Sequence, residues 1–411
     1  MKRRELNKLE AKLDEYMRSL FDGMGREERR RALGWYLTGL LLDGDRKSID
    51  PLAARLAESD AERGAMRQRL QQAVCVASWS DDELYRRLAV RFERELPELE
   101  ALVIDDTGFP KKGTHSVGVA RQYSGTLGRT DNCQVAVSLH LAGAKGSGCI
   151  GFRLFLPDEW TQDPARCRSA GVPEEIVFEK KWKLALGLID RALAFGVRKH
   201  LVLADAGYGD ARDFRDALTE RGLAYLVAIQ GSHSVWPPGS NPQLPARVAG
   251  QNGRPRTRYQ DENVQPLAIE QLSQTLKYEK VTWREGSKGT QSSRFAATRV
   301  RMAEGRMHGK PPSEELWLLC EWPKDEEKPT KFYVSTLPST TTLKELARRA
   351  KLRWRVERDY QEMKQEVGLD HFEGRSWRGF HHHVALCAAA HGFLALRRAL
   401  FPPEQTSVVS A

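Results

Sequence analysis

The chain has 411 residues, of which 40% are hydrophobic and 29% charged, so it can bury the cores of two or three globular domains. Its formal net charge of +10 favours a polyanionic partner, because cationic surfaces attract phosphate backbones. The six cysteines form no CxxC pair, which excludes a zinc ribbon and is typical of a reducing compartment. No apolar run reaches the roughly 18 residues of a membrane span. We therefore expect a cytoplasmic protein with no membrane partner.

Residues 1–97 are predicted to form an all-α region. Apolar side chains recur at helical spacing from Leu6 to Leu41. Two later segments carry helix-start signals, one at Ser48 and the other at Ser80, which precedes an acidic first turn. Because the region is also basic, we expect it to bind DNA.

From residue 98 the pattern changes to strands and helices. Three β-rich segments come first, and a helix, a strand, a second helix and a second strand follow. The expected strands are 101–106, 133–142, 149–157, 200–204 and 223–231, and the expected helices are 178–196 and 211–222. This order predicts an α/β fold over 98–232, with a mixed sheet flanked by helices.

Residues 233–338 read as a β-rich insertion. The segment begins with a loop rich in Pro, Gly, Asn and Arg and continues with four β-like pieces. Helical patterns return over 339–400, where one continuous helix is expected from 342 to 368. The last segment, 401–411, reads as a tail.

Acidic residues stand at three places where a carboxylate is costly unless it is exposed in a crevice, hydrogen-bonded or bound to a metal. Asp105 and Asp106 follow one expected strand, Asp205 follows another, and Glu357 lies in the late helix. The simpler interpretation of each acid is a cap on the following turn. Three carboxylates brought together could instead hold two Mg²⁺ ions about 4 Å apart, as phosphodiester chemistry can require.

The segment "RWRVERDYQEMK" places Arg353, Glu357 and Lys364 at a distinctive spacing. It resembles the DDE transposases of bacterial insertion sequences, in the group with a Tyr-x2-Arg-x3-Glu-x6-Lys signature. "VIDDTG" is similar to the first acidic motif of this family and points to Asp106 rather than Asp105. "LADAGYG" is similar to the second motif and points to Asp205. The 152 residues from Asp205 to Glu357 also match a family with a long insertion.

The resemblance implies an RNase H-like sheet with flanking helices, interrupted by the β-rich insertion and preceded by the all-α region. It implies catalysis by Asp106, Asp205 and Glu357 with two Mg²⁺ ions, for which Mn²⁺ can substitute. The substrates would be double-stranded DNA at transposon ends and at the target. Metal-activated water would cut the ends, and the freed 3′-OH would attack the target without a covalent protein–DNA intermediate. We expect a homodimer on DNA, in the bacterial nucleoid.

Basic residues near the acids are the expected phosphate contacts. On one helix, Arg353, Glu357 and Lys364 would fall close to one face, with Glu357 directed at the metals. The full set of expected DNA-binding residues is Arg353, Lys364, Arg348, Arg349, Lys351, Lys111 and Lys112.

One position departs from the signature, because Ala350 stands where the family has Tyr. This puts a hairpin-forming version of the reaction in doubt but not strand cleavage. Two alternatives stay open: a related metal nuclease without strand transfer, and a non-catalytic DNA-binding protein derived from a transposase. The consecutive histidines 381–383 point to different faces of a helix, so a structural or DNA-facing role is expected for them over zinc binding.

Overall fold

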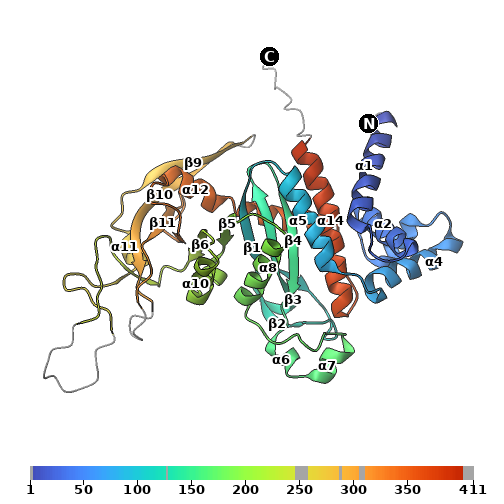
Figure 1. The fold of residues 1–411 in the computed structure, drawn as a ribbon, viewed down its shortest axis with the longest axis horizontal. Helices are drawn as coiled ribbons and strands as arrows, with labels where there is room; N and C mark the ends of the chain where they lie inside the picture. The colour runs from blue at the N-terminus through green and yellow to red at the C-terminus, as the bar shows by residue number, and fades with distance from the viewer. Residues whose placement is uncertain (1–2, 126–127, 246–257, 287–288, 305–310, 401–411) are drawn as a thin grey trace, which may run out of the picture. The chain divides into compact units, whose positions relative to one another are not determined.

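The computed structural model describes residues 3–125, 128–245, 258–286, 289–304 and 311–400 (Figure 1). The chain divides into two compact units, one made of residues 1–198 and 354–411 and the other of residues 199–353. We call them the first and the second unit. The division falls inside the segment 98–232, and the expected domain boundaries stay predictions.

The N-terminal part of the first unit is helical. Its helices bury Tyr36 and neighbouring leucines of α2. Ser80 caps α5, since its hydroxyl accepts a hydrogen bond from the Glu83 amide. The elements are α1 (Arg3–Phe21), α2 (Glu27–Leu41), α3 (Ile49–Leu56), α4 (Asp60–Gln71), the π-helical turn η1 (Gln72–Val76) and α5 (Asp81–Glu95).

The sheet of the first unit is built around the long strand β3. One edge of β3 pairs antiparallel with β1, and the other pairs with β2 and then with β4. The strands are β1 (Leu99–Pro110), β2 (Ala120–Ser124), β3 (Arg129–Gly143) and β4 (Ser147–Leu154). The helices that follow are α6 (Asp158–Thr161), α7 (Pro164–Ser169), α8 (Lys181–Ala194), α13 (Trp354–Gln365) and α14 (Trp377–Leu400).

Two helices cover opposite faces of this sheet. Side chains alternate between the faces of a strand. On β3, Ser138 and His140 contact α13. Leu139 points to the other face, where Leu188 of α8 packs beside Gly151. The acids of β1, which pairs with β3, are therefore sorted between α8 and α13 by their position along the strand.

The second unit holds a mixed sheet. β5 and β6 run parallel, and β12, β11 and β10 then add to β6 in antiparallel order. β10 also pairs with β9 and β7, and β7 pairs with β8. The elements are β5 (Leu201–Ala204), α9 (Ala206–Gly209), α10 (Arg212–Glu220), β6 (Tyr225–Ile229), β7 (Ser234–Trp236), β8 (Leu267–Ala268), α11 (Ile269–Ser273), β9 (Glu279–Gly286), β10 (Gly289–Met302), β11 (Leu316–Trp322), β12 (Lys331–Ser335) and α12 (Leu343–Lys351).

These strands and helices confirm the predicted α/β class. The prediction of one continuous helix from 342 to 368 is wrong, because α12 ends at Lys351 and α13 begins at Trp354. The backbone amide of Leu352 donates a hydrogen bond to the carbonyl of Arg349. This i to i−3 bond tightens the last turn of α12. Arg353 is consequently not on the helix of Glu357. Of the helices in the described parts of the chain, none is long and apolar enough to cross a membrane.

The break has a packing cause that the periodicity hides. α12 buries Leu346 and Ala350 and packs on the sheet of the second unit. α13 buries Val356 and Met363 and packs on the sheet of the first. Each of the two helices is amphipathic by itself, so the sequence pattern predicts one helix. In the structure, α12 packs on one hydrophobic core and α13 on the other.

Candidate active site

Asp105 and Asp106 lie within β1, which continues past them to Pro110, and not at the end of a strand. Asp105 pairs with Ser138 of β3 and Asp106 with Val137, so their side chains point to opposite faces of the sheet. The Asp106 carboxylate lies 2.8 Å from the ammonium of Lys181, the first residue of α8. Asp106 is thus on the α8 face.

Asp105 is on the face of α13. Ser138, its partner on β3, hydrogen-bonds the Tyr360 hydroxyl of α13 at 2.5 Å. Burial first, and then the negative charge of Asp105, raise the pKa of Tyr360 well above its usual value. The strand register therefore places Asp105, rather than the expected Asp106, beside the helix that carries Glu357.

The third acid occupies the exposed flank of α13. Glu357 lies in the first turn and is exposed, which suits a carboxylate near a helix N-terminus. Lys364, two turns further on, donates from Nζ to the Gly108 carbonyl of β1 at 3.1 Å. Burial lowers the pKa of Lys364. An acid and a half-buried cation therefore share one side of α13, next to β1.

A buried polar chain holds α13 against β3. The Asp359 carboxylate lies 2.7 Å from His140 Nδ1 and accepts a hydrogen bond from Ser147 Oγ, also at 2.7 Å. The other ring nitrogen of His140 lies 3.0 Å from Ser138 Oγ, which contacts Tyr360. The composition is that of a Ser-His-Asp triad, but Ser138 is fully buried and is not accessible to a substrate. These buried polar contacts position α13, the helix that carries Glu357.

We expect Asp359→Ala to lower the free energy of unfolding by about 1–3 kcal/mol, because it leaves the buried His140 and Ser147 without their acceptor. Glu357→Ala on the same helix is the matched control. Glu357 is exposed, so its replacement should change stability by less than about 0.5 kcal/mol. Urea unfolding followed by circular dichroism measures both variants, and equal losses would contradict a positioning role for Asp359.

Asp205 lies in the second unit, at the end of β5, where it is the N-cap residue of the short helix α9. α9 ends at Gly209, which approaches β6 closely. A β-carbon at Gly209 would stand 1.9 Å from the Ala228 carbonyl oxygen. Packing against β6 therefore requires glycine at position 209, the last residue of the "DAGYG" motif. This close approach fixes the turn that presents Asp205.

Gly209→Ala is expected to lower the melting temperature, because the two backbones must separate to admit the methyl group. Gly187→Ala in α8 is the control, since a β-carbon there meets no atom within 4 Å. That change should be neutral or raise stability by up to about 1 kcal/mol. Thermal melting tests both, and an unchanged melting temperature for Gly209→Ala would show that the turn tolerates a side chain.

Several cations expected to contact phosphate have partners within the protein. Lys351 Nζ lies 2.6 and 2.5 Å from the two carboxylate oxygens of Glu321, which is 3% exposed. Lys111 donates to the Phe372 carbonyl, and burial lowers the pKa of Lys111. Arg349 pairs with Glu345. The predicted phosphate contacts of Lys351, Lys111 and Arg349 therefore stay predictions, made for side chains that already have partners in the protein. Lys112 is exposed and Arg348 is half-buried.

The position of the missing Tyr is inside the second unit. Ala350 is 5% exposed and belongs to the buried side of α12.

The histidines of α14 are buried. His382 stacks on the ring of Trp79 at a centroid distance of 3.8 Å, and its two nitrogens face backbone carbonyls. The environment of His382 is that of a structural residue.

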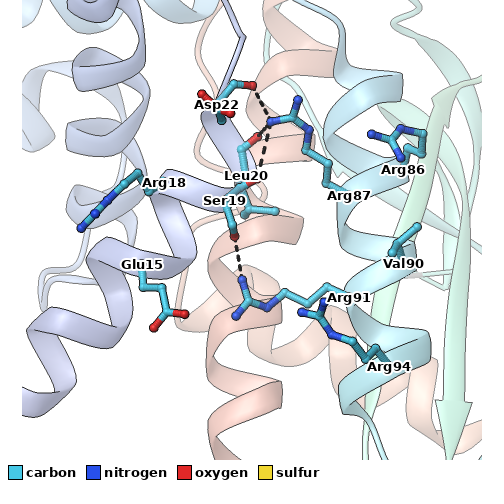
Figure 2. Close-up of a pocket in the computed structure, with 10 residues that line it drawn as sticks. All are labelled: Glu15, Arg18, Ser19, Leu20, Asp22, Arg86, Arg87, Val90, Arg91 and Arg94. Carbon is cyan, nitrogen blue, oxygen red and sulfur yellow. Dashed lines mark hydrogen bonds between the residues drawn. The ribbon is translucent and has the colours of Figure 1, made fainter.

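A groove of about 730 Å³ between α1 and α5 contains five arginines (Figure 2). Arg87 donates to the carbonyls of Leu20 and Asp22 at the end of α1. The α5 arginines also pair with acids of the same helix, Glu83 and Glu95. Two of the five arginines, Arg87 and Arg91, therefore join α1 to α5. The groove is lined by Glu15, Arg18, Ser19, Leu20, Asp22, Arg86, Arg87, Val90, Arg91 and Arg94.

Among the residues described in the structure, no three His, Cys, Asp or Glu side chains form a group that could hold a metal ion. Two of the predicted acids, Asp106 and Glu357, are in the first unit and Asp205 is in the second.

The chain is similar to known proteins over much of its length. A family described as "DDE superfamily endonuclease" matches residues 19–290, about two thirds of the chain. The match includes Asp105, Asp106 and Asp205 and ends before Glu357. A protein of Microchaete diplosiphon described as "Probable transposase for insertion sequence element IS701" is 31% identical over 231 residues. This alignment covers 54% of the chain and 55% of the relative, so the chain spans about half of that relative's length.

Proposed function

Because the chain belongs to the DDE superfamily of endonucleases, we propose that it is a transposase that cuts and joins the DNA ends of an insertion sequence. The observation that carries this proposal is the placement of the acids. Carboxylates stand within β1, at the end of β5 and on the late helix α13, which is the order along the chain that the family resemblance leads us to expect. The spacing of Glu357 and Lys364 on α13 adds to it.

The donor set fits divalent cations such as Mg²⁺ or Mn²⁺, because carboxylate oxygens are the hard ligands that these ions prefer. Asp106 already pairs with a cation, the ammonium of Lys181. Asp205, Glu357 and one acid of β1 would hold the ions. Two such ions would supply a nucleophilic water and stabilise the leaving oxygen of the phosphodiester.

The identity of the first acid rests on two different arguments. The family motif selects Asp106, and the direction of the side chains selects Asp105, which faces α13. A metal held jointly with Glu357 needs an acid on the α13 face. Between the two, the strand register favours Asp105, with Asp106 engaged by Lys181 on the opposite face.

Three Asn variants test the site, because the amide keeps the shape of the acid and loses its charge. We expect Asp205→Asn to abolish cleavage of plasmid DNA that carries the segments flanking the gene, while binding measured by gel shift stays near the wild-type value. Of Asp105→Asn and Asp106→Asn, the variant that is equally inactive identifies the first acid, and we expect it to be Asp105. Loss of DNA binding in Asp205→Asn would contradict a purely catalytic role.

The products separate the proposed activity from its rivals. Joining of cut ends to target DNA is expected of a transposase, cutting without joining would indicate a nuclease, and binding alone would indicate a non-catalytic descendant. Sequencing of the donor ends distinguishes sealed hairpins from open 3′-OH ends. With Ala350 in the core of the second unit, a residue other than the family Tyr would have to support a hairpin.

Lys364 and Lys351 should differ in DNA binding. If Lys364 contacts a phosphate, Lys364→Ala should reduce the slope of log K against log salt by about one. Lys351→Ala should leave that slope unchanged. It should instead destabilise the fold by about 3–5 kcal/mol, because Glu321 stays buried without its partner. Binding titrations at several salt concentrations, with urea unfolding of each variant, measure both effects. An unchanged slope in Lys364→Ala would show that this lysine is structural.

A further inference from the structure

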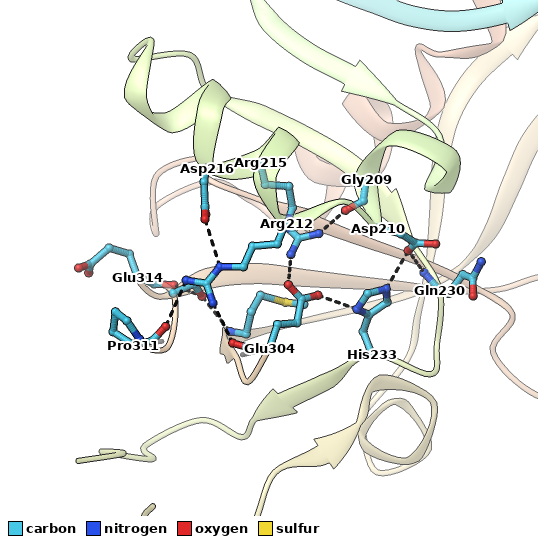
Figure 3. Close-up of polar contacts among 12 residues, drawn as sticks. Gly209, Asp210, Arg212, Arg215, Asp216, Gln230, His233, Glu304, Pro311 and Glu314 are labelled. Atoms are coloured by element: carbon cyan, nitrogen blue, oxygen red, sulfur yellow. Dashed lines mark hydrogen bonds and ion pairs between the residues drawn. The ribbon is translucent and has the colours of Figure 1, made fainter. Parts of the chain in front are cut away.

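A cluster of charged side chains lies at the Gly209 end of the turn that follows Asp205 (Figure 3). It consists of Asp210, Arg215, His233 and Glu304, and we call it the ionic cluster. These residues come from four segments of the second unit: the end of α9, α10, the loop before β7, and the end of β10. None of them has a part in the reaction proposed above.

Arg215 fixes the end of the turn. Its side chain is almost completely buried, with 3% exposure. One guanidinium nitrogen donates to the carbonyl of Gly209, the last residue of α9, and another pairs with Glu304. Gly209 is therefore held at two points, by its close approach to β6 and by the hydrogen bond from Arg215.

His233 lies between two carboxylates. Its Nδ1 is 2.6 Å from Glu304 Oε1 and its Nε2 is 3.1 Å from Asp210 Oδ1. A neutral imidazole has one N–H and can donate to only one of these acids, whereas the imidazolium donates to both. Asp210 Oδ1 also accepts a hydrogen bond from the Gln230 amide at 2.9 Å. Protonated His233 would therefore join the end of α9 to the loop after β6 and to the end of β10.

The charges of the ionic cluster balance when His233 is protonated. Two cations, Arg215 and His233, then face two anions, Asp210 and Glu304. Arg212, the other cation nearby, is occupied by the Glu304 backbone carbonyl and by Asp216. The contact with Glu304 raises the pKa of His233 above its usual value, despite the opposing effect of burial. Deprotonation of His233 leaves an excess of negative charge beside the turn.

We propose that the ionic cluster positions the Asp205 turn and that protonation of His233 tightens it. The consequence for metal binding rests on the proposed role of Asp205; the consequence for the turn itself does not. The direction of the pH dependence follows from the raised pKa of His233. The stabilisation is fully present below the unfolded-state pKa of about 6.5 and is lost as pH rises through the higher value of the folded state. Arg215, His233 and Glu304 are positioning residues and not catalytic ones.

Hydrogen exchange tests the turn without relying on metal or DNA. The amides of residues 205–210 in the full chain are measured at pH 6 and pH 8.5, after correction for intrinsic exchange. We expect greater protection at pH 6 in the wild type, and loss of this difference in His233→Gln. Glu304→Gln, which keeps the size of the side chain and removes its charge, should reproduce the loss. Protection that is equal at both pH values in the wild type would overturn the proposal.

Mn²⁺ binding, followed by the paramagnetic resonance signal of the free ion, tests the link to Asp205. His233→Gln should weaken binding roughly 10-fold at pH 6, as loss of outer-shell support does at other metal sites, and less at pH 8.5. Lys328→Gln, which breaks the exposed pair with Glu270 in the same unit, is the control and should have no effect. Unchanged affinity in Asp205→Asn would refute the proposed metal role of Asp205, and the exchange result would still decide the role of the ionic cluster. An equal loss at both pH values in His233→Gln would refute the role of protonation.

Discussion

The position of Glu357 depends on a carboxylate two residues further along its helix. Asp359 is buried between His140 and Ser147, and a buried charge is tolerable only when its partners satisfy it. That requirement fixes the rotation of α13 about its axis and its height above β3. Glu357, on the exposed flank, then has a defined place relative to β1. In α13 the buried Asp359 sets the geometry of the helix that carries the exposed Glu357.

In the second unit, other contacts fix the position of Asp205. The turn after β5 is held by the close approach of Gly209 to β6 and by the ionic cluster. In both units, an acid proposed to hold metal stands near other charged groups that are paired within the protein. Some charged residues of this chain are therefore used to position elements of the fold.

Local patterns in the sequence predicted local features well. The "DAGYG" turn, the start of α5 at Ser80 and the α/β class all follow from short-range rules. The direction of Asp105 and Asp106 did not follow, because it depends on how far β1 extends and on its register with β3. The pairing of Lys351 with Glu321 joins residues of α12 and β11, which only the fold brings together. The break between α12 and α13 was hidden because each helix has its own apolar face.

The pairing of β12 with β6 has a consequence for how this chain can change. Four residue pairs, from Ser335 opposite Leu226 to Phe332 opposite Ile229, bring the two ends of a long excursion together. The excursion therefore leaves the sheet and returns at neighbouring points. The entropic cost of closing a loop rises only slowly with its length. Segments can therefore be gained or lost between β6 and β12 at a small cost in the stability of the fold. Such tolerance allows a lineage to remodel the parts of this region away from His233 and Glu304, which are the two residues of the excursion that belong to the ionic cluster.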